Sequence, residues 1–331
     1  MSVKVGYYWH EALVQRDPGP MCPEKPERLR ALAPQRLSGR CLGLTHLSFD
    51  ARDASILASV HDARYIACVR DAHSMNRRYL DSGDTAATPD VFDQALLAAS
   101  AGCQAIDDIC NGTIRRAFCA VRPPGHHANS IRAMGFCVFN NVAVAARYAQ
   151  NRMNIERVLI IDWDIHPGNG TQEIFWEDPT VFTLSFHQEG LFEESGRPDL
   201  RGAGAGEGCN RNIPIPAGTE AGVYLHMFEA VVEQIARQFE PELVLISAGF
   251  DAHRSDPASQ LLLEERHFAK MTEIVVRQTI GFTGDRLVSL LEGGYNPPVL
   301  TSCVAAHTTQ LCENCVPHPV QVNSIYPLAG S

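Results

Sequence analysis

The chain has 331 residues, 45% of them hydrophobic, and a formal net charge of -10. This charge argues against a nucleic-acid-binding surface, which needs clustered Lys and Arg, and it favours a cationic substrate. No apolar run approaches the roughly 18 residues of a membrane span, and the N-terminus lacks the charged-then-apolar pattern of a signal peptide. The 11 scattered cysteines fit free thiols better than a disulfide framework, so we expect a cytoplasmic protein without nucleic-acid or membrane partners.

Strands and helices alternate along most of the chain. A first strand is predicted within residues 1–7, followed by a stiff proline-rich loop at 18–26. Helical spacing marks residues 27–33, 54–72, 90–111, 141–150, 170–176, 220–239 and 265–279. Strands are predicted at residues 117–121, 158–161, 181–185, 243–247 and 287–291. This order predicts a single-domain α/β fold, in which helices cover both faces of a mainly parallel sheet.

Three other segments carry weaker signals. The Gly-rich residues 202–208 are expected to form a surface loop, because no predicted strand runs directly into them and no helix runs directly out. Cys312 and Cys315 form a single Cys-x-x-Cys pair, a weak metal motif without a second pair. The single domain is expected to span residues 1–315, and residues 316–331 are expected to form a loosely ordered tail.

One predicted strand ends in an unusual cluster of polar residues. The apolar run at 158–161 leads into Asp162, Asp164 and His166, and then into Pro-Gly-Asn-Gly. While the chain stays extended, these three side chains share one face, so Asp164 and His166 could hold one metal ion. For an isolated Asp-x-His, a salt-bridged strand end is the better explanation.

Three further predicted strands end in glycine-containing loops with metal-binding or acid-base side chains. These loops read RPPGHH at 122–127, SAGFDAH at 247–253 and EGGY at 292–295. In a sheet of this kind, function gathers at the carboxyl ends of the strands. Buried, satisfied histidines would explain one or two such loops, but not four.

The side chains of these loops include a possible metal-ligand set. Asp164, His166 and Asp251 offer two carboxylates and one imidazole, and they leave a coordination position for water and substrate, as in catalytic zinc sites. Oxygen-rich ligands also suit ferrous iron. We therefore expect Zn²⁺, with Fe²⁺ as the alternative.

Acid-base groups accompany the expected metal site. The tandem His126-His127 pair supplies a general acid or base, and Asp162 and Asn169 could fix the tautomers of the two rings. Tyr295 follows two glycines and could donate its hydroxyl to an oxyanion. Phe136 and Phe192 could wall a narrow apolar channel, although each alone is more often a core residue.

Together these segments resemble the zinc-dependent histone deacetylase superfamily, and within it the class II and bacterial amidohydrolase branch. The motifs that carry the resemblance follow the family's order and spacing: RPPGHHA at 122–128, GFCVFNN at 135–141, DWDIHPGNGT at 162–171, SAGFDAH at 247–253 and EGGY at 292–295. The resemblance implies a single arginase-like α/β domain with an eight-stranded parallel sheet. It also implies hydrolysis of acetyl-like amides.

The resemblance assigns a role to each candidate residue. It implies metal ligands at Asp164, His166 and Asp251. The catalytic positions are His127 as general base and acid, His126 as its electrostatic partner, and Tyr295 as the donor to the amide carbonyl. The supporting positions are Asp162 beside His126 and a structural potassium ion, Asn169 beside His127, Gly135, Phe136 and Phe192 along the channel, and Asp84 at the rim.

The chain departs from the family pattern at three positions. Cys22 replaces a histidine often seen in the first loop, and Pro167 replaces a second histidine after the ligand histidine. Ala258 stands where many relatives carry a larger rim residue and polyamine-selective ones an acidic residue. This alanine weakens a polyamine interpretation without removing it.

Several functions are compatible with these residues. The leading hypothesis is hydrolysis of an acyl-lysine side chain in a protein or peptide, and the alternative is hydrolysis of an acetylpolyamine or another acylated small amine. A catalytically silent acyl-lysine binder is disfavoured by the intact His127 and Tyr295. A two-manganese ureohydrolase would need a carboxylate in place of Gly168. The sequence leaves the acyl chain length open, and it allows a homo-oligomer.

Overall fold

The computed structural model describes residues 3–37, 43–192 and 195–313. Cys315 and the tail predicted at residues 316–331 lie outside the described residues. The strands of the structure are β1 (Val5–Tyr8), β2 (Leu44–Leu47), β3 (Arg116–Cys119), β4 (Val158–Asp162), β5 (Val181–Gln188), β6 (Asn210–Ile215), β7 (Leu243–Ala248) and β8 (Leu287–Leu291). They form one eight-stranded sheet in the order β2-β1-β3-β8-β7-β4-β5-β6, and the neighbouring strands pair in parallel. The predicted parallel sheet is confirmed.

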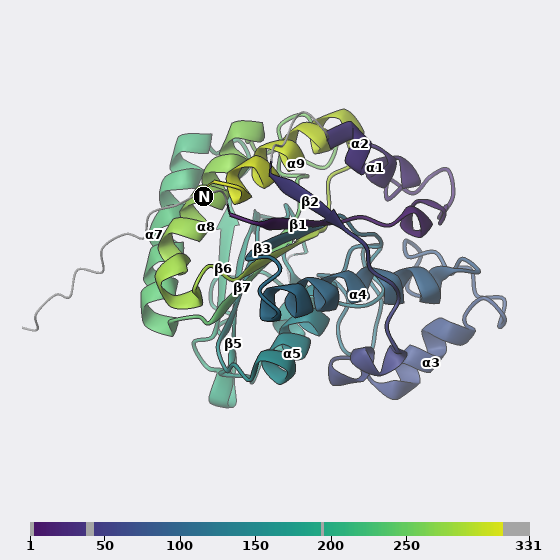
Figure 1. The fold of residues 1–331 in the computed structure, drawn as a ribbon. Helices are drawn as coiled ribbons and strands as arrows, with labels where there is room; N and C mark the ends of the chain where they lie inside the picture. Colours follow the sequence, from purple (N-terminus) through teal and green to yellow (C-terminus); the bar gives the residue numbers. More distant parts are fainter. Residues whose placement is uncertain (1–2, 38–42, 193–194, 314–331) are drawn as a thin grey trace, which may run out of the picture.

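Helices cover both faces of this sheet. The α-helices are α1 (Pro26–Arg30), α2 (Pro34–Leu37), α3 (Ala63–Asp71), α4 (Val91–Cys110), α5 (Asn141–Met153), α6 (Asn169–Ile174), α7 (Ala221–Phe239), α8 (Glu265–Thr283) and α9 (Pro297–Leu311). Short 3-10 helices are η1 (Glu11–Val14), η2 (Ala54–Ser59) and η3 (Gly204–Gly206). Helices α4 and α5 pack together on one face, and α7, α8 and α9 pack on the other (Figure 1). The result is the three-layer arrangement expected when parallel strands are connected by helices.

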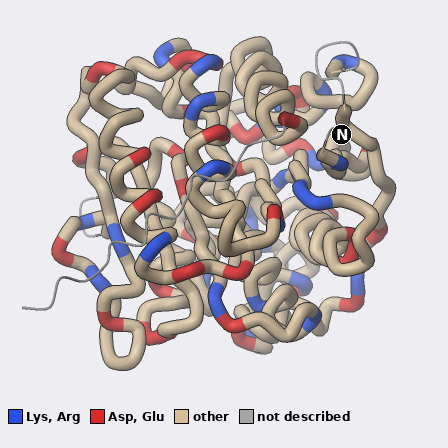
Figure 2. Tube along the Cα trace, turned by 60° about the vertical axis from the view of Figure 1, so that its left-hand side comes forward, with Lys and Arg blue, Asp and Glu red and all other residues tan. Residues whose placement is uncertain are grey.

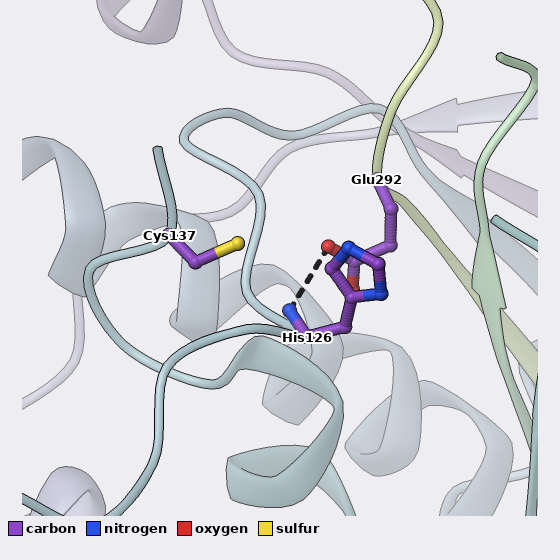
Figure 3. A group of neighbouring side chains, drawn as sticks. All are labelled: His126, Cys137 and Glu292. Carbon is purple, nitrogen blue, oxygen red and sulfur yellow. Dashed lines mark hydrogen bonds between the residues drawn. The ribbon is translucent and has the colours of Figure 1, made fainter. Parts of the chain in front are cut away.

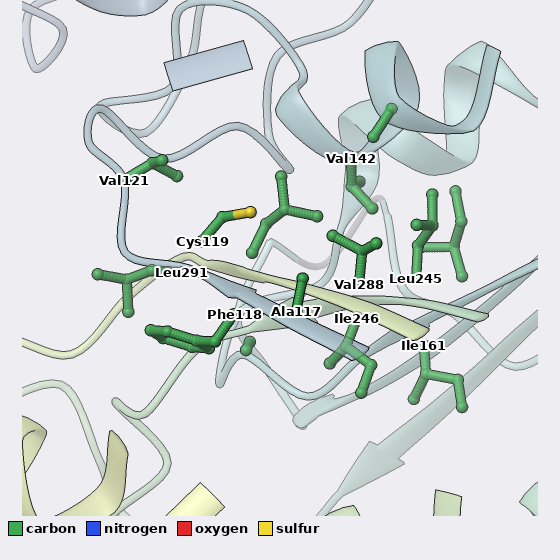
Figure 4. Close-up of a cluster of buried hydrophobic side chains, with 14 of the residues drawn as sticks. Ala117, Phe118, Cys119, Val121, Val142, Ile161, Leu245, Ile246, Val288 and Leu291 are labelled. Carbon is green, nitrogen blue, oxygen red and sulfur yellow. The ribbon is translucent and has the colours of Figure 1, made fainter. Parts of the chain in front are cut away.

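The central strands are buried on both faces, because each is a nearly continuous apolar run. Every residue of β3, β4, β7 and β8 is buried. Their side chains interdigitate in the core with Val142 from α5 (Figure 4). Trp163, which follows β4, is fully buried and packs its ring 5.5 Å from that of His307 in α9. The core therefore fixes where the loops after these strands begin.

Two local predictions were wrong. The helix predicted at 54–72 is two helices, because η2 ends at Ser59 and the Asp62 side chain accepts from the Arg64 backbone N–H to start α3. The extended chain predicted from Asp162 to His166 ends with β4 at Asp162. Asp162 Oδ1 accepts from the Asp164 N–H at 3.0 Å, and Asp164 Oδ1 accepts from the His166 N–H at 2.9 Å. These side-chain to backbone bonds bend the chain out of the strand.

Buried histidines should make stability depend on pH. Burial lowers the pKa of His307 to about 3 and the pKa of His61 to about 4. An unfolded histidine has a pKa near 6.5, so between these values the unfolded chain binds more protons than the folded one. The contribution of each histidine to stability is therefore complete above about pH 6.5 and is lost as pH falls toward the folded pKa.

We expect the free energy of unfolding to decrease as pH falls from 7.5 to 5, with His307 contributing up to about 1.4 kcal/mol per pH unit. Urea unfolding at several pH values measures this slope. His307→Gln removes a group that can take up a proton, so its slope should be smaller than that of the wild type. Equal slopes in the two proteins would contradict the assignment to His307.

Candidate active site

The four strands that end in polar loops are neighbours in the sheet. They occupy the consecutive positions β3-β8-β7-β4, at the centre of the sheet order. Because the strands are parallel, the loops that follow them emerge at one edge. The four loops therefore converge, as the sequence predicts. They comprise residues 122–127, 163–169, 249–253 and 292–295.

Asp164, His166 and Asp251 face a common point. One ligand atom from each lies within 4.8 Å of the others. The Nδ1 atom of His166 is 3.0 Å from Asp164 Oδ1 and 3.4 Å from Asp251 Oδ2. Among the described residues, nothing forms a hydrogen bond with the buried Asp251 Oδ2. A divalent cation would give that oxygen a partner, so the donor set fits Zn²⁺ and, with its two carboxylates, also Fe²⁺.

The charges of this cluster also favour a bound cation. Burial and the neighbouring Asp164 carboxylate raise the pKa of Asp251 to about 7. Burial opposes a charge on His166, yet Asp164 and Asp251 raise the pKa of its imidazole to about 10. Two carboxylates that share one small buried space favour a positive charge between them.

Glycines allow the two carboxylates to approach each other. A Cβ atom on Gly249 would lie 2.2 Å from Asp164 Oδ2, and one on Gly293 would lie 2.0 Å from Asp251 Oδ2. The Gly293 N–H donates to Asp164 Oδ2 at 2.8 Å, and the Ile165 N–H donates to Asp251 Oδ1 at 2.9 Å. The backbone therefore fixes one oxygen of each carboxylate.

The two adjacent histidines have different partners and opposite charge preferences. His126 Nδ1 is 2.9 Å from Asp162 Oδ2, and His127 Nδ1 is 2.6 Å from Asn169 Oδ1. Although burial opposes it, the carboxylates of Asp162 and Asp164 raise the pKa of His126 well above its usual value. Burial and the neighbouring His126 ring lower the pKa of His127 well below its usual value. His126 is therefore the cationic ring and His127 the neutral one.

The contact with Asn169 also fixes the tautomer of His127. An amide oxygen can only accept, so His127 Nδ1 carries the hydrogen and donates it to Asn169 Oδ1. This leaves His127 Nε2 with a free lone pair. A neutral ring with a free Nε2 can act as a general base.

Tyr295 lies near the same cluster on the loop after β8. Its backbone N–H donates to Asp256 Oδ2 at 2.6 Å, which holds the loop in place. The guanidinium carbon of Arg28 lies 5.0 Å from the centre of the Tyr295 ring. Burial, together with the charges of Asp251 and Asp164, raises the pKa of Tyr295 well above its usual value. Its hydroxyl is therefore protonated and can donate a hydrogen bond.

Phe136 and Phe192 each lie close to one of these groups. The Phe192 ring is 5.0 Å from the His127 ring, and the Phe136 ring is 6.1 Å from the Tyr295 ring. Both phenylalanines have a positive φ, 66° and 52°, which is uncommon for bulky residues and often marks functional sites. A Cβ atom on Gly135 would lie 2.3 Å from His127 Cδ2, so only glycine fits there. Asp84 is exposed, on the loop at 81–85.

Comparison with known proteins identifies the family. A family model described as the histone deacetylase domain matches residues 22–311. The chain belongs to the histone deacetylase family. The Arabidopsis thaliana protein "Histone deacetylase 14, chloroplastic" is 36% identical over 287 residues, a match that covers 84% of this chain and 67% of that protein. The Homo sapiens protein "Polyamine deacetylase HDAC10" is 38% identical over 294 residues, covering 85% of this chain and 43% of that protein.

A solved structure supports the same conclusion. The crystal structure of the HDA15 HD domain matches with a TM-score of 0.84 at 33% sequence identity, covering 94% of this chain and 90% of the other. The arginase-like deacetylase fold implied by the sequence motifs is therefore confirmed. This deacetylase domain acts on acetyl amides as a hydrolase, as its family membership shows.

The candidate site includes a buried glutamate whose contacts the sequence did not predict. Glu292 Oε2 accepts from the Gly125 N–H at 2.7 Å and from the His126 N–H at 3.2 Å, and Oε1 accepts from the Ser247 hydroxyl at 3.2 Å. Figure 3 shows the Glu292 side chain directed toward His126, whose backbone N–H forms the hydrogen bond marked by the dashed line. The Cys137 side chain lies on the opposite side of this hydrogen bond from Glu292. Glu292, which directly follows β8, thus joins the loop after β3 to strand β7.

Arg28 is a second residue whose place the sequence did not predict. This buried side chain from α1 donates to the carbonyl oxygens of Glu292 and Gly294, the latter at 2.6 Å. It therefore holds the loop that carries Tyr295. The sequence shows Arg28 only as a charged residue in a short helix, and such residues are usually exposed, so its buried position could not be predicted.

Charged residues of both signs are spread through the deacetylase domain. Figure 2 shows acidic and basic residues interspersed along the trace rather than separated by sign. Within the described part of the chain, no helix has the length and hydropathy needed to cross a bilayer.

Proposed function

We propose that this chain is a zinc-dependent lysine deacylase, which hydrolyses acetyl-like amides on lysine side chains of peptides or proteins. The observation that carries the proposal is the placement of a neutral His127, with its Nε2 free, beside the Asp164, His166 and Asp251 cluster. A protonated Tyr295 hydroxyl completes the set of groups needed for amide hydrolysis.

The residues of the chain divide the chemistry between them. Asp164, His166 and Asp251 would hold the zinc ion, which supplies Lewis-acid polarisation of the acyl carbonyl and lowers the pKa of water. His127 Nε2 takes a proton from the water that attacks the carbonyl carbon. The Tyr295 hydroxyl donates to the carbonyl oxygen as negative charge develops on it.

The second half of the reaction uses the same histidine. The carbon–nitrogen bond breaks as protonated His127 gives its proton from Nε2 to the leaving amine nitrogen. The products are a carboxylic acid and a free amine. The cationic His126 ring, whose centre is 4.0 Å from that of His127, disfavours a lasting second charge on His127 and so promotes this return of the proton.

Acetylpolyamine hydrolysis is the second candidate. The similarity to a protein named polyamine deacetylase favours it. Ala258 argues against it, because an acidic side chain at that rim position would favour a polycation. A catalytically silent acyl-lysine binder is a weaker candidate, because binding alone would not require the acid-base group of His127 or the hydroxyl of Tyr295.

Metal removal and restoration test the proposed function. We expect the purified protein to hydrolyse an acetyl-lysine peptide, to lose this activity when a chelator removes the metal, and to regain it with Zn²⁺ or Fe²⁺. Turnover of acetylspermidine, measured in parallel, should be lower. Faster turnover of acetylspermidine would favour the polyamine alternative, and binding of the peptide without hydrolysis would favour the silent binder.

We propose two further properties with the function, the first implied by the resemblance and the second by the scattered cysteines of the chain. One is a structural potassium ion near the buried Asp162, which elemental analysis of the purified protein would detect. The other is a cytoplasmic location, which imaging of a tagged protein would test. The Arabidopsis relative is named as chloroplastic, so a plastid signal would overturn the proposed location.

A further inference from the structure

Asp81 lies on the loop that carries Asp84, and no step of the proposed chemistry uses it. One of its carboxylate oxygens, Oδ1, accepts three backbone N–H groups, from Gly83 at 3.0 Å, Asp84 at 3.1 Å and Thr85 at 3.0 Å. The Leu80 N–H donates to the Thr85 carbonyl at 2.8 Å and closes the turn. A single carboxylate therefore shapes the loop from which Asp84 projects.

The second oxygen of Asp81 connects this loop to the channel wall. The buried Thr85 hydroxyl is hydrogen-bonded to Asp81 Oδ2 and lies 3.0 Å from Asp84 Oδ1. The same hydroxyl oxygen accepts from the Phe136 backbone N–H at 3.1 Å. Since Phe136 holds a positive φ of 66°, its conformation depends on contacts such as this one.

Asp81 also affects the charge of Asp84. Although Asp84 is exposed, partial desolvation of its carboxyl and the hydrogen-bonded Asp81 carboxylate raise its pKa to about 6. The pKa of Asp81 is lowered to about 2, because the hydrogen bonds from its own loop outweigh its burial. The other titratable groups near Asp84 include Arg78, Tyr79 and Cys22, which line the same cavity of about 410 Å³, and the buried Cys137, whose thiol interacts electrostatically with Asp84.

We propose that Asp81 is a positioning residue for substrate binding, which holds the rim acid Asp84 and the channel wall Phe136 in their working geometry. The proposal rests on the proposed function and on the role that the family resemblance implies for Asp84, which is to bind the substrate backbone at the rim. Two features separate Asp81 from an ordinary loop residue. Its contacts reach both Asp84 and Phe136 through a single hydroxyl, and its charge lies beside that of Asp84.

Two substitutions separate the geometry from the charge. Asp81→Ala removes the acceptors, so we expect KM for an acetyl-lysine peptide to rise roughly tenfold, as for loss of one charge-assisted hydrogen bond, with a smaller change in kcat. Asp81→Asn keeps an oxygen for the three N–H groups and an amide for Thr85 but removes the charge. At pH 8 its KM should stay near that of the wild type.

The pH profile of KM reports the charge effect. In the wild type, KM should rise below about pH 6, because Asp84 becomes protonated and can no longer accept as a carboxylate. In Asp81→Asn this rise should move to lower pH, since a neighbouring negative charge has been removed. A purely structural role would leave the profile unchanged.

A matched control and a measurement without turnover complete the test. The Asp53 carboxylate caps η2 in a similar way, because its Oδ1 accepts from the Ser55 backbone N–H at 2.9 Å. Asp53→Ala removes this cap and should leave KM unchanged. Amide hydrogen exchange at Phe136 should become faster in Asp81→Ala, whatever substrate the enzyme prefers. Unchanged exchange at Phe136, or a fall in kcat at constant KM, would overturn the inference. Absence of wild-type turnover would instead overturn the proposed function.

Discussion

Replacing Tyr295 by Phe is expected to lower the turnover of an acetyl-lysine peptide roughly 10²–10³-fold while the protein keeps its metal, as for the loss of one oxyanion donor. The substitution removes only a hydroxyl that is held protonated, and the ring contacts with Arg28 and Phe136 remain. Zinc content should be unchanged, because the clustered ligand atoms come from Asp164, His166 and Asp251.

Steady-state kinetics and metal analysis of the same preparation measure the two parts of this prediction. Tyr148→Phe is the matched control, since it removes another half-buried hydroxyl, one that bonds Asp107 on α4 at 2.9 Å. Its kcat should equal that of the wild type. If Tyr295→Phe retained full activity with a full complement of metal, the assigned role of Tyr295 would be wrong.

The centre of the fold could be predicted from the sequence because its strands are continuous apolar runs. The structure places β3, β4, β7 and β8 within a few residues of the predicted positions, and they are buried as such runs require. The convergence of their loops followed from the parallel arrangement alone. Parallel strands carry their carboxyl ends to one edge, wherever each lies in the chain.

The edges of the fold could not be predicted in this way. Strand β2 has two exposed residues among its four, so its pattern is weak. Strand β6 contains two asparagines and a proline, and the amides of Asn210 and Asn212 both bond Gln172. Helix α9 begins with two prolines and buries the polar His307, whose ring contacts Thr272 and Ser289 across 35 and 18 residues of sequence. Such elements depend on partners distant in the chain.

The residues of the candidate site also differ in how well the sequence predicts them. The groups expected to do chemistry stand directly after apolar strands, where the sequence marks them. The residues that hold them, Arg28, Asp81 and Glu292, act through backbone groups far along the chain or through a loop. Every non-proline residue carries the same backbone N–H and carbonyl groups, so residue type does not show which of them a side chain will contact. Only the structure reveals these contacts.

Gly293→Ala is expected to lower the affinity for zinc by at least about 10- to 100-fold, the range seen when groups around metal ligands are changed. The added Cβ would lie 2.0 Å from Asp251 Oδ2 and 2.5 Å from Asp164 Oδ2, much closer than atoms can approach. Neither carboxylate can move away freely, because the Ile165 N–H holds Asp251 and the Gly293 N–H holds Asp164. The φ of Gly293 is not positive, so lack of space rather than backbone strain causes the loss.

Competition with a chelating dye measures this affinity, and thermal unfolding shows whether the apo-protein still folds. Gly281→Ala is the control, because a Cβ on Gly281 in α8 would meet nothing within 4 Å. That variant should bind zinc like the wild type and gain roughly 0.5–1 kcal/mol of stability, as Ala does over Gly inside a helix. If Gly293→Ala folded and bound zinc with wild-type affinity, the metal could not lie between Asp164 and Asp251.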